Sequence, residues 1–397
     1  MTRFRRRLSI VAVLAVLLAL ALGAFIHLST RRALERAEAF RFRRMQVTLQ
    51  GEHGAYRFFY ATNRSVDRQD GAVEERFGKQ REPVLEFGLF DTDIEPSLGI
   101  GMLVDPTDWF QNEEIKLREV RPLERNSWIE RLREQVHASP HRALLVNVNG
   151  FREQFPSALR KSAFVAHVLD IDAPMLVFDW PGDQGSTLRG YRRAQRVAAE
   201  SGAELARALE LIIREVQPER LWLLANSMGA EVVVNAFSLL YQLPDLADSE
   251  TEFEDVVLTA PDIAHEDFGD RFKDEIGALT RNLTVYVSSN DRALLMSRIL
   301  NREQRLGEST IDLRNLDQSD EAARALDLVE PGSERVTVVD VTPINRTRNF
   351  HNFSLETPEF FDDLFLRLTN TEAVPSRLRY RVGTRGGAEY WVLTRGR

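Results

Sequence analysis

The chain has 397 residues, 43% of them hydrophobic and 28% charged, which is enough for one large globular core with additions. Its net charge of −8 at pH 7 argues against a general nucleic-acid-binding role, which requires a basic surface. The absence of cysteine excludes disulfides, thiolate metal sites, cysteine nucleophiles and lipid attachment at a cysteine.

The first element that the sequence predicts is a membrane anchor. Arginines at positions 3, 5, 6 and 7 precede residues 8–28, which contain no Asp, Glu, Lys or Arg and can cross a bilayer as one helix. We expect residues 1–30 to be retained as this anchor. A cleaved signal peptide is the alternative, because Ala19, Leu20 and Ala21 form the small-x-small pattern of a cleavage site.

The same arginines predict the side of the membrane on which the chain lies. Positive charge before an apolar segment favours a cytoplasmic N-terminus. We therefore expect a single-pass protein of the cytoplasmic membrane whose remaining residues lie on the extracytoplasmic, periplasmic side. If the segment is instead a signal peptide, the protein is expected to be secreted to the periplasm after cleavage.

Residues 31–54 are predicted to be a juxtamembrane linker, helical in its first part and rich in Arg, Glu and Ala. The folded domain is expected to begin at residue 55 with an aromatic-rich strand. A polar loop is expected over residues 66–82. The next elements are expected to be strands near residues 84–90, 98–104 and 115–120, and a helix over residues 126–137.

From residue 143 onward, buried strands alternate with helices. The strands are expected at residues 143–148, 175–180, 221–224, 255–260, 283–288 and 335–341. The helices are expected at residues 155–169, 188–216, 230–240 and 360–368. This alternation predicts an α/β fold with a mainly parallel sheet and helices on both of its faces. The domain is expected to span residues 55–372.

Residues 373–397 differ in character from this domain. Tyr380 and Val382 face Tyr390 and Val392 across a Gly-Gly pair, a pattern that predicts a hairpin. Arginines outnumber acidic residues here, so the hairpin is basic. We expect it to be a solvated addition to a sheet edge, with contact to anionic lipid head groups as the alternative.

Ser227 lies where a predicted strand gives way to a predicted helix. The apolar run that ends at Leu224 leads into a turn with small residues at Ala225 and Gly229, and apolar positions at helical spacing follow. This strand–turn–helix context is typical of a nucleophile elbow, in which backbone crowding requires small residues around the serine. The alternative is a serine that caps the helix and has no catalytic role.

A serine nucleophile needs a histidine base and a carboxylate that orients the histidine. Sites built on such an elbow place the acid and then the base after the serine, at the carboxyl ends of later strands. His351 follows the last predicted strand and is the predicted base, whereas His265 comes one strand too early. Asp291 follows the strand over residues 283–288 and is the predicted acid, with Asp262 as the alternative acid.

Backbone donors must also stabilise the oxyanion that forms during acyl transfer. The strand over residues 143–148 ends in Asn149-Gly150-Phe151, where glycine lets the backbone approach a substrate closely. We expect the amides of Phe151 and Met228 to form the oxyanion hole. The sequence has no His-Glu-x-x-His motif and no glycine-rich phosphate loop before a helix, so it predicts neither a metal nor a cofactor.

Short blocks in family order between about residues 56 and 368 are similar to one protein family. The blocks are Phe59-Tyr60-Ala61-Thr62-Asn63-Arg64, Phe87-Gly88, Val148-Asn149-Gly150-Phe151, Trp180-Pro181-Gly182, Asn226-Ser227-Met228-Gly229, Ala260-Pro261-Asp262, Asp291-Arg292-Ala293-Leu294 with Ser297, Arg305-Leu306-Gly307, and Asp340-Val341 followed by His351. On these blocks the chain resembles a bacterial alpha/beta-hydrolase family of unknown function in the esterase/lipase superfamily. The resemblance implies the alpha/beta-hydrolase fold and puts Ser227, Asp291 and His351 at the positions of the catalytic triad.

Asn149 and Asn226 depart from the usual pattern of this family, which has histidine at both positions. The leading hypothesis is a membrane-anchored serine hydrolase that acts on a small-molecule ester or similar acyl compound through an acyl-serine intermediate. The second hypothesis is a non-catalytic envelope protein that keeps the fold as a binding or assembly module, and the two asparagines favour it. No nucleic-acid partner is expected, and the sequence points to no particular protein partner.

Overall fold

The computed structural model describes Leu17 and residues 55–68, 70–94, 115–247, 253–308, 336–347, 350–369, 379–383 and 389–394. The predicted anchor, apart from Leu17, and the predicted linker over residues 31–54 lie outside the described residues. The strand expected near residues 98–104 lies outside them as well. Within the described part of the chain, the structure has no helix with the length and apolarity that a membrane span requires.

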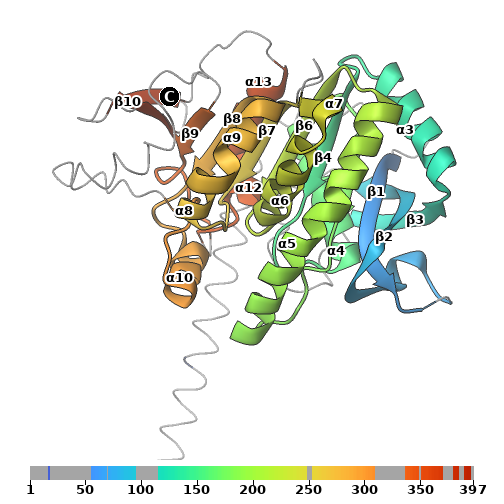
Figure 1. Cartoon of the computed structure of the whole chain (residues 1–397), viewed down its shortest axis with the longest axis horizontal. Coiled ribbons are helices and arrows are strands. Elements are labelled where there is room, and N and C mark those ends of the chain that lie inside the picture. Colours follow the sequence, from blue (N-terminus) through green and yellow to red (C-terminus); the bar gives the residue numbers. More distant parts are fainter. Residues whose placement is uncertain are drawn as a thin grey trace, which may run out of the picture.

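An eleven-stranded sheet runs through the domain in the order β10-β11-β9-β8-β7-β6-β4-β5-β1-β2-β3 (Figure 1). Its parallel centre consists of β4 (Ala143–Val148), β5 (Met175–Asp179), β6 (Arg220–Asn226), β7 (Phe253–Thr259), β8 (Thr280–Val287) and β9 (Val336–Asp340). All residues of β4 and β5 are buried, as strands covered on both faces require. The predicted mainly parallel sheet is therefore confirmed.

Both edges of the sheet contain antiparallel pairs. At one edge, β1 (Ala55–Val66) lies parallel to β5 and antiparallel to β2 (Phe77–Ile94), which pairs with β3 (Ile115–Leu123). The predicted loop over residues 66–82 is wrong in its second half, because β2 already begins at Phe77. Pairing with β1 sets this strand despite its polar sequence, since strand propensity is weak beside tertiary context.

The other edge is formed by β10 (Arg379–Gly383) and β11 (Glu389–Leu393), which pair as a hairpin. β11 extends the sheet by lying parallel to β9. The side chain of Arg379 is buried against Asp363, with both Nε and Nη2 donating to the carboxylate at 2.6 Å. This arginine is thus an anchoring group of the hairpin, whereas the sequence alone predicted a solvated basic segment.

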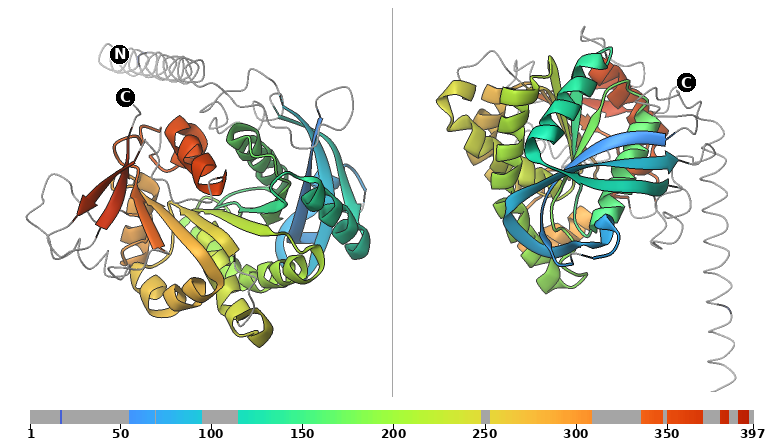
Figure 2. Two further views of the ribbon diagram at one scale, coloured as in Figure 1. Left: turned by 90° about the horizontal axis from the view of Figure 1, so that it is seen from above. Right: turned by 90° about the vertical axis from the view of Figure 1, so that its right-hand side faces the viewer.

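Helices cover both faces of the sheet (Figure 2). One face carries α3 (Arg125–Ala138), α5 (Leu188–Leu211) with its continuation η2 (Ile212–Val216), α6 (Gly229–Tyr241) and α9 (Lys273–Leu279). The other carries α4 (Phe155–Leu169), α12 (Phe353–Glu356) and α13 (Pro358–Thr369). The shorter elements are η1 (Val73–Glu75), α7 (Pro244–Ala247), α8 (His265–Asp267), η3 (Phe268–Phe272) and α10 (Arg292–Asn301).

The sheet has a hydrophobic core on each face, because successive side chains of a strand point to opposite faces. In β4, Leu144 and Val146 pack into the cluster beneath α5 and α6, whereas Ala143 and Leu145 pack into the cluster beneath α4 and α13. The carboxyl ends of the parallel strands meet at one edge, since the register pairs Val148 with Ala225. The loops that follow β4, β6, β8 and β9 are therefore neighbours.

Candidate active site

The turn between β6 and α6 holds Ser227 in a strained backbone conformation. Ser227 has a φ of 53°, in the left-handed region that residues with a Cβ atom seldom adopt. Its N–H donates to the Thr259 carbonyl at 2.9 Å, and its own carbonyl accepts from the N–H of Asp262 at 3.1 Å. The end of β7 and the loop after it thus fix this strained turn.

Gly229 and Gly150 let two backbone segments meet at the serine. A Cβ atom on Gly229 would lie 2.6 Å from the carbonyl oxygens of Val148 and Asn149, so no larger residue fits there without displacing the end of β4. A Cβ atom on Gly150 would lie 3.0 Å from the Cβ atom of Ser227. The small residues expected from the sequence therefore allow the loop after β4 to lie close to the elbow.

Ser227, His351 and Asp291 lie in one hydrogen-bonded row. The Nε2 atom of His351 is 2.9 Å from the Oγ atom of Ser227, and its Nδ1 atom is 2.7 Å from the Oδ2 atom of Asp291. The Oδ1 atom of Asp291 accepts from the backbone N–H groups of Ala293 and Leu294 at 2.9 and 3.0 Å. Asp291 is thus both the N-cap of α10 and the carboxylate that orients the imidazole.

The loop that carries His351 is held by a group of polar residues that the sequence did not single out. The side-chain amide of Asn345 donates to the carbonyl of Phe350 at 2.6 Å and to the Oγ atom of Ser288 at 2.8 Å. The amide of Asn290 donates to the carbonyl of Asn345 at 3.0 Å. The available signal was that polar residues follow two neighbouring strands, at the same edge of the sheet.

The surroundings of His351 change its basicity in opposing ways. Burial by itself lowers the pKa of His351, because a charged imidazolium loses hydration. The negative charge of Asp291 and its hydrogen bond to Nδ1 act in the other direction and outweigh burial, so the pKa of His351 is raised above its ordinary value of 6.5. A raised pKa strengthens His351 as an acceptor for the serine proton.

Two backbone amides beside Ser227 make no hydrogen bond to any residue that the structure describes. Among the described residues, neither the N–H of Phe151 nor that of Met228 donates a hydrogen bond. Phe151 lies in the loop after β4, and Met228 is the residue before α6. Free amides on the two segments that flank the serine are what an oxyanion hole requires.

The loop with Phe151 is fixed from its other side by the turn that follows β5. The indole Nε1 of Trp180 donates to the carbonyl of Asn149 at 2.8 Å, and the N–H of Arg152 donates to the carbonyl of Gly182 at 3.0 Å. A Cβ atom on Gly182 would lie 3.0 Å from the carbonyl oxygen of Gly150. The Trp180-Pro181-Gly182 block therefore supports the loop directly.

Arg64, a residue of β1, binds the turn that follows β5 from inside the protein. Its Nε donates to Asp179 at 2.6 Å and its Nη1 donates to Asp183 at 2.8 Å, with both arginine and Asp179 almost fully buried. Its Nη2 donates to the carbonyls of Glu153 at 2.7 Å and Trp180 at 2.8 Å. One guanidinium thus fixes both loops behind the amides of Phe151 and Met228. The resemblance to the family included Arg64 in one of its blocks but assigned it no role.

The alternative acid, Asp262, does not contact His351. Its Oδ1 atom accepts from Arg305 at 2.7 Å and from Ser297 at 2.6 Å, and its Oδ2 atom accepts from Tyr191 at 2.7 Å. Arg305 also donates to the backbone carbonyl of Asp262 at 2.6 Å. The N–H of Asp262 also donates to the carbonyl of Ser227. Asp262 therefore has a structural role beside the serine turn.

The side chains of Asn149 and Asn226 form hydrogen bonds that give both residues a structural role. The amide of Asn149 donates to the carbonyl of Ala158 and to the Oγ atom of Ser162, both in α4, at 3.2 and 3.0 Å. The Oδ1 atom of Asn226 accepts from Thr259 at 2.9 Å and from Ser354 at 3.2 Å. Both side chains connect the site to its supports.

The serine opens into a cavity of about 1020 Å³. Its walls come from the loop after β4, the start of α5, α10 and the loop that carries His351. Polar groups such as Asn147 and Lys161 line one part, and Leu188, Met296 and Leu300 line another. In the described part of the chain, no group of His, Asp or Glu side chains is arranged to hold a metal ion.

Comparison with known proteins gives a family and several similar solved structures. The model of the family "Alpha/beta hydrolase of unknown function (DUF900)" matches residues 124–364. Among solved structures, the chain is similar to phospholipase PlaB from Legionella pneumophila, with 13% identity and a TM-score of 0.21. That similarity covers 52% of this chain and 40% of the phospholipase, so less than half of the phospholipase is matched. No curated protein matches the chain.

Proposed function

Because this chain belongs to a family of alpha/beta hydrolases of unknown function, we propose that it is a serine hydrolase that cleaves an ester or similar acyl bond through an acyl-Ser227 intermediate. The observation that carries the proposal is the row from Ser227 through His351 to Asp291, at 2.9 and 2.7 Å. These distances are within the range for direct proton transfer.

In the first half of the reaction, the Oγ atom of Ser227 attacks the acyl carbonyl while the Nε2 atom of His351 accepts the serine proton. The negative charge on the carbonyl oxygen is stabilised by the amides of Phe151 and Met228. When the tetrahedral intermediate collapses, the bond to the leaving alcohol breaks and His351 gives the alcohol its proton. The acyl group is then attached to Ser227.

In the second half, water attacks the acyl-serine carbonyl and His351 accepts a proton from the water. Collapse of the second tetrahedral intermediate releases the carboxylic acid, and His351 returns its proton to Ser227. Asp291 keeps Nδ1 of the imidazole protonated and directed away from the serine throughout both steps. It stabilises the imidazolium that forms in each of them.

Labelling with a fluorophosphonate probe tests this proposal on the full chain. We expect the probe to react with the parent protein and with Ser186→Ala, since Ser186 lines the cavity but the hydrogen bond to Nε2 of His351 comes from Ser227. Ser227→Ala is expected to prevent labelling. A folded parent protein that neither reacts with the probe nor hydrolyses any short activated ester would contradict the proposal.

The second function, a non-catalytic binding or assembly module of the envelope, was favoured in the sequence by Asn149 and Asn226. Both side chains have structural contacts that do not involve the serine hydroxyl, and this supports the enzyme over the module. Labelling that is absent from a folded parent protein would favour the module.

We also propose that residues 8–28 hold the protein in the cytoplasmic membrane, with residues beyond 31 on the periplasmic side. The support for this is the uncharged segment and the arginines before it. Secretion to the periplasm after cleavage remains the alternative outcome of the test given in the Discussion.

A further inference from the structure

We infer that the mouth of the cavity is a docking surface for an anionic lipid bilayer. The inference concerns the start of α5 and the outer face of α10, which project on the same side of the domain (Figures 1 and 2). Tyr191 of α5 is hydrogen-bonded to Ser297 at 2.7 Å and to Asn301 at 3.2 Å, so the two helices are in contact. We call this surface, formed by residues 188–196 and 292–299, the α5–α10 rim.

α10 buries Leu294 in the core, and beside its exposed Arg292 and Arg298 it presents a group of apolar side chains to solvent. Its polar residues Ser297 and Asn301 face the protein, where they bind Tyr191. Leu295, Met296 and Ile299 are 41%, 55% and 60% exposed. Apolar side chains exposed to water do not gain the favourable free energy of burial. A helix that presents them outward is therefore stabilised when another apolar phase covers it.

Exposed apolar side chains gather on this rim. Ten large apolar side chains are exposed in the described part of the chain, and four of them belong to this rim: Leu188 on α5 and the three on α10. Scattered single residues of this kind need no explanation, but a gathered group indicates an interaction surface.

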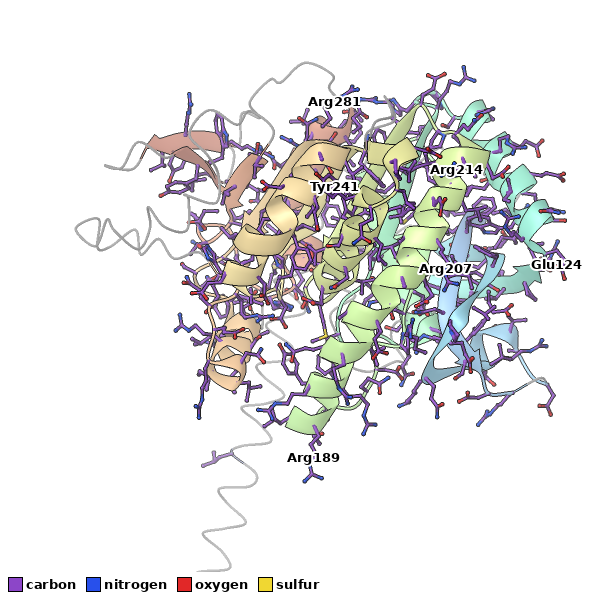
Figure 3. The ribbon with its side chains drawn as sticks, viewed as in Figure 1. Glu124, Arg189, Arg207, Arg214, Tyr241 and Arg281 are labelled. Carbon is purple, nitrogen blue, oxygen red and sulfur yellow. The ribbon has the colours of Figure 1, made fainter. Side chains whose placement is uncertain are left out.

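The charge of the rim identifies the partner. Arg189, Arg192, Arg193 and Arg196 recur at the spacing of one helical face at the start of α5, with no acidic residue among residues 188–199. All four are exposed, and none has an ion-pair partner among the described residues. Arg189 extends outward from the end of α5 (Figure 3). Unpaired arginines beside apolar residues, in a protein of net charge −8, fit the negative surface and apolar interior of an anionic bilayer.

The rim continues into the cavity that contains Ser227. Leu188 and Met296 are exposed to solvent and also line the cavity. Leu300 and Phe151, which are half-buried, line it as well. A bilayer on the rim would thus face an apolar entrance to the serine.

The predicted anchor is compatible with this orientation. Residues 29–54 separate the uncharged segment from β1, and 26 residues can extend over up to about 90 Å. The linker therefore does not restrict which side of the domain meets the bilayer.

The absence of cysteine permits a direct test on the full chain. Ile299→Cys and Tyr241→Cys each provide one attachment point for an environment-sensitive fluorophore. Tyr241 is a matched control because it is also exposed and apolar, at 43%, but lies far from Arg189 on the helical layer (Figure 3). The vesicles contain equimolar phosphatidylglycerol and phosphatidylcholine brominated on its acyl chains, which quenches a fluorophore inside the bilayer.

We expect strong quenching at position 299 and little at position 241. Replacing phosphatidylglycerol by phosphatidylcholine, or adding Arg192→Glu and Arg193→Glu, is expected to reduce quenching at position 299 by about threefold or more, because each arginine near an anionic surface contributes to binding. Equal quenching at both positions would overturn the inference. So would excimer emission from pyrene at position 299 without lipid, since that would identify a second copy of the chain as the partner.

This measurement does not depend on turnover, so its outcome is separate from that of the proposed function. In the Ser227→Ala protein, quenching at position 299 should be unchanged. If the proposed function also holds, Leu295→Ser with Ile299→Ser should lower hydrolysis of an acyl ester embedded in vesicles by about fivefold or more. Hydrolysis of a short soluble ester should be unaffected, since neither residue lines the cavity.

Discussion

Asp291 binds His351 with one carboxylate oxygen and caps α10 with the other. The contact to Nδ1 is 2.7 Å long, and the two cap contacts are 2.9 and 3.0 Å long. Because the helix cap fixes the carboxylate before any substrate arrives, the imidazole is held in one orientation toward Ser227. Loss of the charge on this one side chain should therefore affect turnover far more than folding.

Asp291→Asn is expected to lower kcat for a short activated ester by about three to four orders of magnitude. The amide oxygen can still cap α10, but the amide no longer holds His351 in the required tautomer or stabilises its positive charge. Steady-state kinetics measure the effect, and circular dichroism checks the fold.

Asp262→Asn is the matched variant for that comparison. It leaves Arg305 buried without its full counter-charge, so we expect a loss of stability of about 3 kcal/mol or more with a much smaller change in kcat of the folded fraction. If Asp262→Asn removed turnover and Asp291→Asn did not, the assignment of the acid would be wrong.

The pH dependence of hydrolysis is expected to follow His351. The imidazole must be neutral to accept the serine proton, and its pKa is raised above 6.5, so kcat/KM should rise with pH through a midpoint above 6.5. In Asp291→Asn the residual activity should show this midpoint at lower pH, because only the weaker effect of the Asp262 charge then opposes the lowering of the pKa of His351 by burial. A midpoint that is the same in both proteins would argue against His351 as the base.

The same raised pKa has a consequence for folding. A group whose folded-state pKa exceeds its unfolded value of 6.5 contributes stability that is fully present below pH 6.5 and is lost as pH rises through the folded-state pKa. His351→Gln should remove this contribution. Urea unfolding of parent and variant at pH 6 and pH 9 measures it, and the stability difference between the two proteins should depend on pH.

Arg64→Ala is expected to destabilise the protein by about 3–5 kcal/mol, because it leaves Asp179 buried and unpaired. It should also lower kcat/KM, since the loops with Phe151 and Trp180 lose their shared donor. Arg64→Lys should recover only part of the lost stability and part of the lost kcat/KM, because one ammonium group cannot replace the planar guanidinium with its several directed donors.

Arg214→Ala is the control for Arg64. Its pair with Glu210 spans one helical turn, its second pair is with Asp245, and both pairs are exposed, so their loss should cost about 0.5 kcal/mol or less. Equal losses of stability for the two alanine variants would contradict the anchoring role that we assign to Arg64. Chemical denaturation provides both values.

Ser227→Gly should be more stable than Ser227→Ala by about 0.5–1 kcal/mol. Alanine keeps the Cβ atom at a φ of 53°, whereas glycine removes the strain, and the larger unfolded-state entropy of glycine offsets part of the gain. Neither variant should react with a fluorophosphonate. Denaturant unfolding compares them, and a more stable alanine variant would mean that the turn is not strained.

Fractionation tests the predicted anchor. We expect the mature protein to begin at its original N-terminus and to stay with membranes after a high-salt wash, with residues beyond 31 open to protease added from the periplasmic side. Recovery of a soluble form that begins near Ala24 would identify a cleaved signal peptide instead.

The sequence by itself determined the features that depend on local order. The bounds of β4 and α4 were predicted as they occur, because buried strands and helices differ in their periodicity. Chain order and strand ends also brought attention to Ser227, Asp291 and His351, and the structure places these three side chains in contact. Their catalytic roles stay a prediction.

Only the tertiary structure decided which carboxylate meets His351. Asp262 and Asp291 both follow parallel strands, so strand position favoured Asp291 but kept Asp262 as the alternative. In the structure, Asp262 binds Arg305, which is 43 positions away, and Asp291 binds His351, which is 60 positions away. The burial of Arg64, 89 residues before the carbonyl of Glu153, was equally out of reach. Such pairs depend on strand order, register and side-chain direction, and hydrophobic periodicity encodes none of these across distant segments.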